Sequence, residues 1–342
     1  MTGAAHTTPP SRATLAGRLL LILDHGSEHG APDILDPTGR PMTRLYGGVE
    51  TGGTWCVCAV GAGPDDIARE EQFPTGRPDD TLERITEFFR ARPRPEAIGI
   101  GSFGPVDVDP RSPTWGYVTT TPKVGWRHVA VAPVLHDRLA VPVAFDHDVA
   151  AAGLGEYRWG AGAQAGALSY LTVGTGIGAG LLIDGKPWHG LIHPEVGHLR
   201  IPHDRDRDPF PGACAMHGDC WEGLASGPAI EQRWGIPGSD LSDEHPGWDL
   251  EAEYLALGIL SIVCVFSPER IVAGGGVMER AGLLDKVRTR LRGLLGGYLE
   301  SPLLGEEIDA FLVPPALGDR AGVLGAIALA EAALEGDERN SG

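Results

Sequence analysis

Residues 47–54 read GGVETGGT, and residues 172–180 read TVGTGIGAG. In each stretch an apolar run leads into a short turn of glycine and threonine, and a second apolar run follows. This pattern predicts a strand, a tight turn and a returning strand. We therefore expect strands over 45–50 and 55–60, and again over 168–174 and 179–183. Because one of these similar segments stands in each half of the chain, the repeat predicts two lobes of similar design that face one another.

In the rest of the chain, expected strands alternate with expected helices. Short apolar runs predict strands over 97–101, 141–145 and 271–273. Helical spacing of apolar residues and capping signals predict seven helices, which begin near Asp79 or Asp80 and at 130, 148, 224, 249, 279 and 319. Alternation of this kind is typical of α/β folds, and 342 residues are too many for one comfortable core.

The chain therefore divides into two expected domains. An N-terminal α/β lobe covers 43–150, with a C-terminal helix over 319–335 packed on it. A C-terminal α/β lobe covers 151–318 and carries a long loop over 193–222. Residues 1–42 have little periodicity, so we expect a flexible leader there, or a true translation start at Met42.

The composition excludes several classes of function. Lysine and arginine total 28 against 46 acidic residues, which gives a formal net charge of −18. Such a surface repels nucleic acid and anionic lipid, which are bound by clustered Lys and Arg. The five cysteines are an odd number and argue against a complete disulfide framework. No apolar run reaches the roughly 20 residues that span a bilayer, so we expect a cytoplasmic protein.

The two glycine turns are candidate phosphate sites. Glycines let the backbone approach a phosphate and point successive N–H groups at it, and threonine hydroxyls add donors. The residues concerned are Gly52, Gly53 and Thr54 in the first turn and Gly174, Thr175 and Gly176 in the second. Either turn alone is better explained as an ordinary hairpin, and neither is followed by the Lys-Ser/Thr of a Walker loop. Together, one in each half, they predict a phosphate clamp.

A third glycine run, Gly274-Gly275-Gly276, follows an expected strand. A turn without side-chain bulk lets a flat adenine ring lie against the backbone, although an ordinary loop is the simple alternative.

A pair of carboxylates follows another expected strand, in Phe145-Asp146-His147-Asp148. A carboxylate at the carboxyl end of a strand projects into the cleft of an α/β sheet. There it can accept the proton of an attacking hydroxyl group. The alternative is that Asp146 or Asp148 only caps the following helix.

The loop over 193–222 is rich in metal ligands. Cys214, His217 and Cys220 have the spacing of zinc ligands, and His198 is the natural fourth ligand, with His193 and His203 as rivals. Four protein ligands would fill the tetrahedron and make the zinc ion structural. Glu195 and Glu222 flank these residues and suit a polyhydroxy ligand, although a solvated loop is the alternative.

Taken in order, these motifs resemble those of the ROK family of sugar kinases and repressors. The resemblance covers about 45–335 and rests on the segments GGVETGGT, SFGPVDV, TTTPKVGW, DHDVAAAGLGE, VGTGIGAG, HPEVGH, CAMHGDCWEGLASGPAI and AGGGV. The TTTPKVGW segment and the zinc loop look most like the bacterial fructokinases of the family. The resemblance implies the actin-like, ribonuclease-H-like ATPase fold, with two α/β lobes and a central cleft.

The resemblance also implies roles for individual residues. Asp148 would be the base that activates the sugar 6-hydroxyl for attack on Mg-ATP. Further positions would contact the sugar: Glu195, His198, Glu222, Gly104 and Pro105. His198 would bind zinc through one ring nitrogen and the sugar through the other. The glycine turns would hold the phosphates, and Gly274 to Gly276 would flank the adenosine. His147 and Ala150 depart from the family pattern, which usually has Asn or Thr before the base and Asn two residues after it.

The sequence thus predicts an ATP-dependent hexose kinase, with fructose as the first choice of substrate. Mannose, glucose and N-acetylhexosamines are alternatives within the class. A sugar-responsive repressor is the alternative outside it, but residues 1–42 are too short and too weakly basic for a helix-turn-helix module. By analogy with the family we expect a homodimer.

Overall fold

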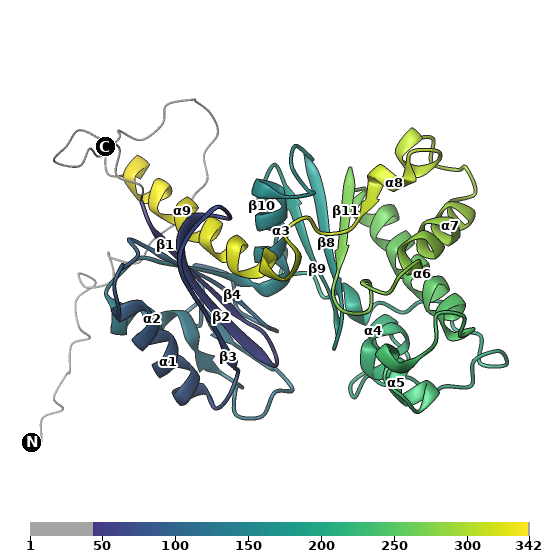
Figure 1. Cartoon of the computed structure of the whole chain (residues 1–342), viewed down its shortest axis with the longest axis horizontal. Helices are drawn as coiled ribbons and strands as arrows, with labels where there is room; N and C mark the ends of the chain where they lie inside the picture. The colour runs from purple at the N-terminus through teal and green to yellow at the C-terminus, as the bar shows by residue number, and fades with distance from the viewer. Residues whose placement is uncertain (1–43, 341–342) are drawn as a thin grey trace, which may run out of the picture.

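The computed structural model describes residues 44–340, so the expected leader over 1–42 lies outside the described residues. Two lobes stand side by side, each built around a five-stranded mixed sheet (Figure 1). In the described part of the chain, no helix is long and apolar enough to cross a membrane.

The sheet of the first lobe has the strand order β3-β2-β1-β4-β7. Its antiparallel strands are β1 (Tyr46–Thr51), β2 (Trp55–Gly63) and β3 (Asp66–Pro74). The strands parallel to β1 are β4 (Ile98–Ser102) and β7 (Val143–His147). Thr51 pairs with Ser102, which in turn pairs with His147, so these three parallel strands end at one edge.

The second sheet repeats this arrangement in the order β10-β9-β8-β11-β12. Its antiparallel strands are β8 (Ala167–Val173), β9 (Ile177–Ile183) and β10 (Lys186–Pro187). Its parallel additions are β11 (Arg270–Gly274) and β12 (Leu312–Val313). The two predicted hairpins, β1–β2 and β8–β9, are therefore confirmed. Their similar sequences occupy equivalent positions in two sheets of the same topology.

Helices cover both faces of each sheet. In the first lobe, α1 (Pro78–Arg90) and α2 (Val131–Leu139) lie on one face and α9 (Ala321–Asn340) on the other (Figure 1). In the second lobe, α3 (Asp148–Trp159) lies on the face toward the first lobe, and α6 (Gly247–Phe266) and α7 (Leu283–Leu295) lie on the far face. The remaining elements are short: β5 (Tyr117–Val118), β6 (Val129–Ala130), α4 (Trp221–Ala225), α5 (Gly227–Trp234), α8 (Ile308–Phe311) and 3₁₀ turns over Val196–His198, Gly238–Asp240, Pro302–Leu304 and Gly318–Arg320.

The helices α3 and α9 cross between the two sheets at very short range. A Cβ atom on Gly325 would overlap the carbonyl oxygen of Ala151, and one on Gly155 would lie 2.7 Å from the carbonyl oxygen of Ala321. Only glycine permits this approach. The crossing sets α3, and with it the residues at its start, firmly between the lobes.

Two elements differ from the sequence prediction. The strand β3 was not predicted, because DIAREEQFP is highly charged; it lies at the sheet edge with most of its side chains outside the core. The single helix expected over 224–234 is two helices, α4 and α5. Ser226 separates them, and its hydroxyl accepts a hydrogen bond from the backbone N–H of Ala229 as the N-cap of α5.

Candidate active site

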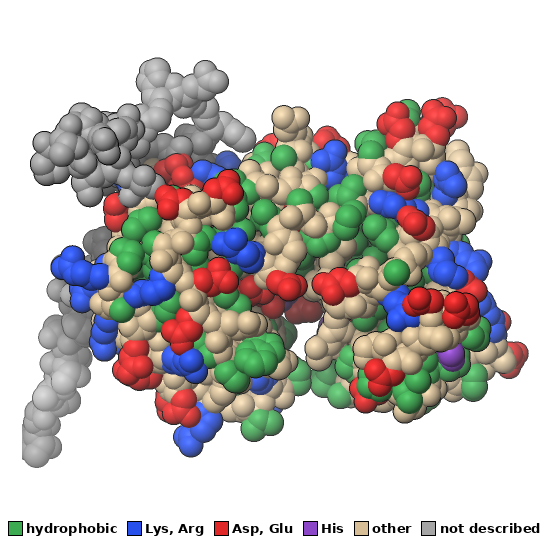
Figure 2. All heavy atoms as spheres, viewed as in Figure 1, with side chains coloured by type: hydrophobic (Ala, Val, Ile, Leu, Met, Phe, Trp, Pro, Cys, Tyr) green, Lys and Arg blue, Asp and Glu red, His purple; other side chains and the backbone are tan. Residues whose placement is uncertain are grey.

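The carboxyl edge of the first sheet carries three of the predicted motifs. β1 ends at the turn Gly52–Thr54, β4 is followed by Gly104 and Pro105, and β7 leads directly into Asp148. Because parallel strands end at one edge, these segments are brought together from distant parts of the chain. The surface is hollowed between the lobes, and acidic side chains gather at the border of the hollow (Figure 2).

Asp148 is the first residue of α3 and does not cap it, since the N-cap position is His147. One oxygen, Oδ1, accepts a hydrogen bond from the backbone N–H of Val149 at 2.8 Å and lies 3.3 Å from Nε2 of His147. Burial raises the pKa of Asp148 to about 6. The carboxylate is therefore a stronger proton acceptor than an exposed aspartate, yet it is ionised at neutral pH.

A second carboxylate, Glu50 at the end of β1, faces the same space. Burial, with the negative charges of Asp148 and Asp319, raises its pKa to about 7. The carboxylate packs against Gly322 in α9, where any Cβ atom would overlap it. Glu50 and Asp148 thus present carboxylate oxygens, the ligands that Mg²⁺ prefers, to one part of the cleft.

Two imidazole rings are stacked beside Asp148. The rings of His147 and His193 have centroids 4.2 Å apart and planes 11° from parallel. Gly104 makes room for them, because a Cβ atom there would lie 3.0 Å from the first ring and 3.2 Å from the second. Next to the pair, Nε2 of His189 lies 3.0 Å from a carboxylate oxygen of Asp146. Burial lowers the pKa of both stacked histidines to about 4, so both are neutral at pH 7.

Two acidic residues of the second lobe complete this group. Burial and the charges of Glu222 and Asp148 raise the pKa of Glu195 to about 7. Glu222 is held at the second glycine turn. Its Oε2 accepts a hydrogen bond from the N–H of Ile177 at 3.1 Å, and a Cβ atom on Gly176 would lie 2.6 Å from it. Acceptors for hydroxyl groups therefore lie close to both the phosphate turn and Asp148.

The four expected zinc ligands are gathered into one cluster. The ligand atoms of His198, Cys214, His217 and Cys220 all lie within 4.8 Å of one another. Nδ1 of His198 is 3.9 Å from Sγ of Cys214 and 3.6 Å from Sγ of Cys220. A tetrahedral zinc ion with bonds of about 2.3 Å to sulfur and about 2.0 Å to nitrogen requires S···N separations of about 3.5 Å. The cluster therefore fits a zinc ion in both donor type and spacing.

Both rival ligands are engaged elsewhere. His193 belongs to the stacked pair beside Asp148. His203 lies between Asp219 and Asp208, with Nδ1 3.1 Å from a carboxylate oxygen of Asp219 and Nε2 2.9 Å from the carbonyl oxygen of Asp208. Asp208 in turn accepts hydrogen bonds from Tyr254 at 2.7 Å and Arg233 at 3.3 Å. The loop is thus anchored to α5 and α6 independently of any metal.

The second glycine turn opens onto a cavity of about 640 Å³ in the second lobe. Gly174 and Thr175 line it, together with Gly276, Trp248 and Arg280. Gly274 and Gly275 do not line it: a Cβ atom on Gly274 would contact Pro315, and one on Gly275 would contact the backbone of Val173. Only Gly276 of the third glycine run therefore faces this space.

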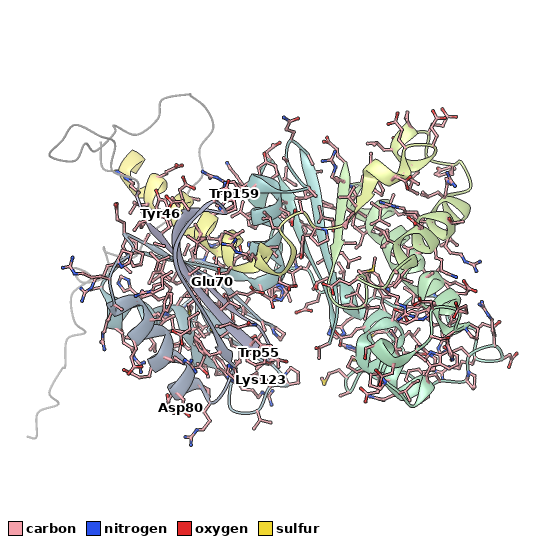
Figure 3. The ribbon with its side chains drawn as sticks, in the orientation of Figure 1. Tyr46, Trp55, Glu70, Asp80, Lys123 and Trp159 are labelled. Atoms are coloured by element: carbon pink, nitrogen blue, oxygen red, sulfur yellow. The ribbon has the colours of Figure 1, made fainter. Side chains whose placement is uncertain are left out.

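The first glycine turn has a lysine beside it. Nζ of Lys123 donates a hydrogen bond to the carbonyl oxygen of Gly53 at 2.6 Å, and space for a Cβ atom at Gly53 is open. Trp55, half exposed, lies near Lys123 at the end of the first sheet (Figure 3). Lys123 thus brings a positive charge to a candidate phosphate site in an acidic protein.

The sequence of this chain is similar to those of known proteins. The sequence model of the ROK family matches residues 46–333. The chain belongs to the ROK family. The fructokinase of Zymomonas mobilis subsp. mobilis is 43% identical to it over 298 residues, which cover 85% of this chain and 97% of the relative. The fructokinase of Streptococcus mutans serotype c is 38% identical over 294 residues, which cover 85% and 98%.

Solved ROK structures share the fold. The ROK hexokinase of Thermus thermophilus is 27% identical, with a TM-score of 0.69 over 87% of this chain and 100% of the other. A ROK glucokinase of Streptomyces griseus, in complex with glucose and AMPPNP, is 26% identical, with a TM-score of 0.67 over 84% and 99%. The predicted family and the actin-like ATPase fold are confirmed.

Several residues at the site of this ROK protein had little or no signal in the sequence. Glu50 stands two residues before the predicted phosphate turn, and that position was a usable signal. Lys123 lies in the quoted TTTPKVGW segment, but nothing in the sequence indicated which turn it approaches. His193 and His147 were noticed for other reasons, as a rival ligand and as a departure from the family pattern. Their stacking joins segments 46 residues apart and has no local signal.

Proposed function

We propose that this ROK protein is a fructokinase, which transfers the γ-phosphoryl group of Mg-ATP to the 6-hydroxyl of D-fructose. Relatives named fructokinase, 43% and 38% identical over nearly their whole length, support the substrate. The observation that carries the reaction is the position of Asp148, a carboxylate of raised pKa among two phosphate turns and two sugar-binding acids.

Asp148 acts as the general base. It accepts the proton of the 6-hydroxyl while that oxygen forms a bond to the γ-phosphorus, and the bond from phosphorus to the bridging oxygen of ADP breaks. A pKa of about 6 leaves the base ionised at neutral pH and closer to the pKa that favours proton transfer.

ATP lies between the two glycine turns. The adenosine occupies the cavity lined by Gly276 and Trp248, and Gly174 and Thr175 at its edge meet the phosphates. Backbone N–H groups of Gly52 to Thr54 receive the γ-phosphate from the other lobe. Lys123, beside Gly53, supplies a compensating charge. Glu50 and phosphate oxygens would hold Mg²⁺, which would neutralise charge on the transferred group.

The sugar is held by Glu195, Glu222 and His198, with Gly104 and Pro105 at its border. Zinc held by His198, Cys214, His217 and Cys220 would be structural, because four protein ligands would leave no open position. His198 faces the thiols through Nδ1, which leaves Nε2 to contact the sugar. Zinc would therefore fix the orientation of a sugar-binding imidazole.

The test is release of ADP by the purified protein with Mg-ATP and each of five sugars: fructose, mannose, glucose, N-acetylglucosamine and N-acetylmannosamine. We expect the highest kcat/KM with fructose. Preference for another hexose would overturn the substrate but leave the reaction standing, whereas no turnover on any sugar would contradict the kinase assignment.

A further inference from the structure

Within the part of the chain that the structure describes, His193 makes a well-formed hydrogen bond through one of its two ring nitrogens. Its side chain is 1% exposed, and its Nε2 is 3.0 Å from the backbone nitrogen of Val106. The other nitrogen, Nδ1, is buried and makes no well-formed hydrogen bond within residues 44–340, although the backbone of Pro194 lies close to the ring. A buried polar atom without a partner destabilises a folded protein, so such an atom calls for an explanation.

The contact with Val106 fixes which nitrogen carries the proton. A backbone N–H group can only donate, so Nε2 of His193 must be the unprotonated acceptor. The imidazole is then neutral and carries its hydrogen on Nδ1. The lowered pKa of His193, which burial causes, agrees with a neutral ring. Nδ1 is therefore a donor without a well-placed acceptor among the described residues.

The surroundings show where this donor is directed. Oε1 of Glu195 is 3.7 Å from Nδ1, too far for a hydrogen bond. On its face, the ring is stacked on His147, which neighbours Asp148. Nδ1 thus lies beside Glu195, the acid expected to hold the sugar, and its ring packs on the neighbour of the expected base.

We propose that Nδ1–H of His193 donates a hydrogen bond to a hydroxyl oxygen of the bound hexose, whose own hydrogen is donated to Glu195. One hydroxyl group would accept the hydrogen bond from Nδ1 of His193. It would also bridge the 3.7 Å between Nδ1 and Oε1 of Glu195, which is too long for a direct hydrogen bond. His193 would then be a specificity-determining residue, because a site with a buried donor discriminates against a sugar that lacks the matching hydroxyl. This inference rests on the proposed hexose kinase function.

A metal ion is the competing occupant. His147, His193 and Glu195 offer atoms within 4.8 Å of one another, a spacing that a metal ion could bridge. The tautomer argues against it, because a nitrogen that carries a hydrogen has no free lone pair for a metal, and the second nitrogen is occupied by Val106.

A matched pair of substitutions separates the two nitrogens. In His193→Asn, the side-chain amide nitrogen can occupy the place of Nδ1, but no atom reaches Val106. In His193→Gln, the amide oxygen can occupy the place of Nε2 and accept from Val106, but no donor remains at the position of Nδ1. Both variants lose the ring and its stacking, so they are controls for each other.

Dissociation constants for fructose would be measured by calorimetry, and KM and kcat by ADP release, on folded full-length proteins. We expect His193→Gln to weaken fructose binding roughly 3- to 10-fold, the effect of one lost hydrogen bond, and His193→Asn to stay within about 3-fold of the wild type. Among monodeoxyfructoses, we expect one to bind the wild type more weakly than fructose does, and His193→Gln to lose this discrimination.

Equal binding by both variants and the wild type would overturn the inference while leaving the kinase function standing. Stronger loss in His193→Asn than in His193→Gln would also overturn it, since the bond to Val106 would then be the important one. A second equivalent of zinc per chain that disappears in His193→Asn would assign the site to a metal instead. If the wild type prefers another hexose, the fructose assignment falls and the same comparison with that sugar decides the inference. A wild type that binds no hexose would overturn both proposals.

Discussion

Asp148→Asn is expected to stabilise the folded protein. The environment that raises the pKa of Asp148 from 3.8 to about 6 disfavours the charged carboxylate in the folded state. This rise corresponds to about 3 kcal/mol of folding free energy, at about 1.4 kcal/mol for each pKa unit. Because asparagine is neutral and its amide oxygen can still accept from Val149, the substitution removes the penalty and keeps the local hydrogen bond.

The stabilisation by Asp148→Asn depends on pH, because only the charged form of Asp148 destabilises the folded state. A carboxyl group with a raised folded pKa binds its proton more tightly in the folded state, so the penalty is absent below about 3.8, grows up to about 6 and is complete above it. We expect Asp148→Asn to raise the free energy of unfolding by about 2–3 kcal/mol at pH 8, by about half as much at pH 5 and by little at pH 4.

Urea unfolding at these three pH values, without ligands, measures the effect. Asp137→Asn is the matched control, because Asp137 is exposed on α2 and its substitution is expected to change stability by less than about 0.5 kcal/mol. If the gain in the free energy of unfolding is absent at pH 8, or equal at all three pH values, burial of the charged Asp148 carboxylate does not destabilise the folded protein as proposed.

Three further outcomes are expected. The kcat/KM for fructose should fall about tenfold for each pH unit below about 6, because the protonated Asp148 cannot accept the hydroxyl proton; a profile flat down to pH 4.5 would contradict its role. Lys123→Met should raise the KM for ATP several-fold with little change in the KM for fructose, as steady-state kinetics can measure; the reverse pattern would place Lys123 at the sugar. Elemental analysis should find about one zinc ion per chain. Removal of this zinc by a chelator should weaken fructose binding measured by calorimetry. If zinc-free protein binds fructose with full affinity, the orientation of His198 by zinc does not contribute to sugar binding.

Local signals in the sequence predicted a large part of the fold. The hairpins around Gly52 and Gly174 were predictable because glycine turns and apolar strands are short-range features. Cys214, His217 and Cys220 lie within one loop, so their spacing alone indicated the metal cluster that the structure assembles. The charged strand β3 gave no such signal, because its neighbours in the sheet, rather than its own composition, hold it in place.

The environment of the candidate base was harder to predict. Glu50, His193 and Asp148 come from three distant segments, and their mutual effects arise only when the lobes and α9 pack together. The alternative that Asp148 merely caps α3 was also open from sequence, and the structure assigns that position to His147. Burial, which sets these pKa values, is a property of the folded molecule.

The central claim is that Asp148 removes the proton from a bound sugar. We would measure kcat for Asp148→Asn with Mg-ATP and fructose, together with fructose binding by calorimetry in the same preparation. The account predicts a fall in kcat of at least about 100-fold, with the dissociation constant for fructose within a few-fold of the wild type. A kcat near that of the wild type, in protein that binds fructose normally, would contradict it.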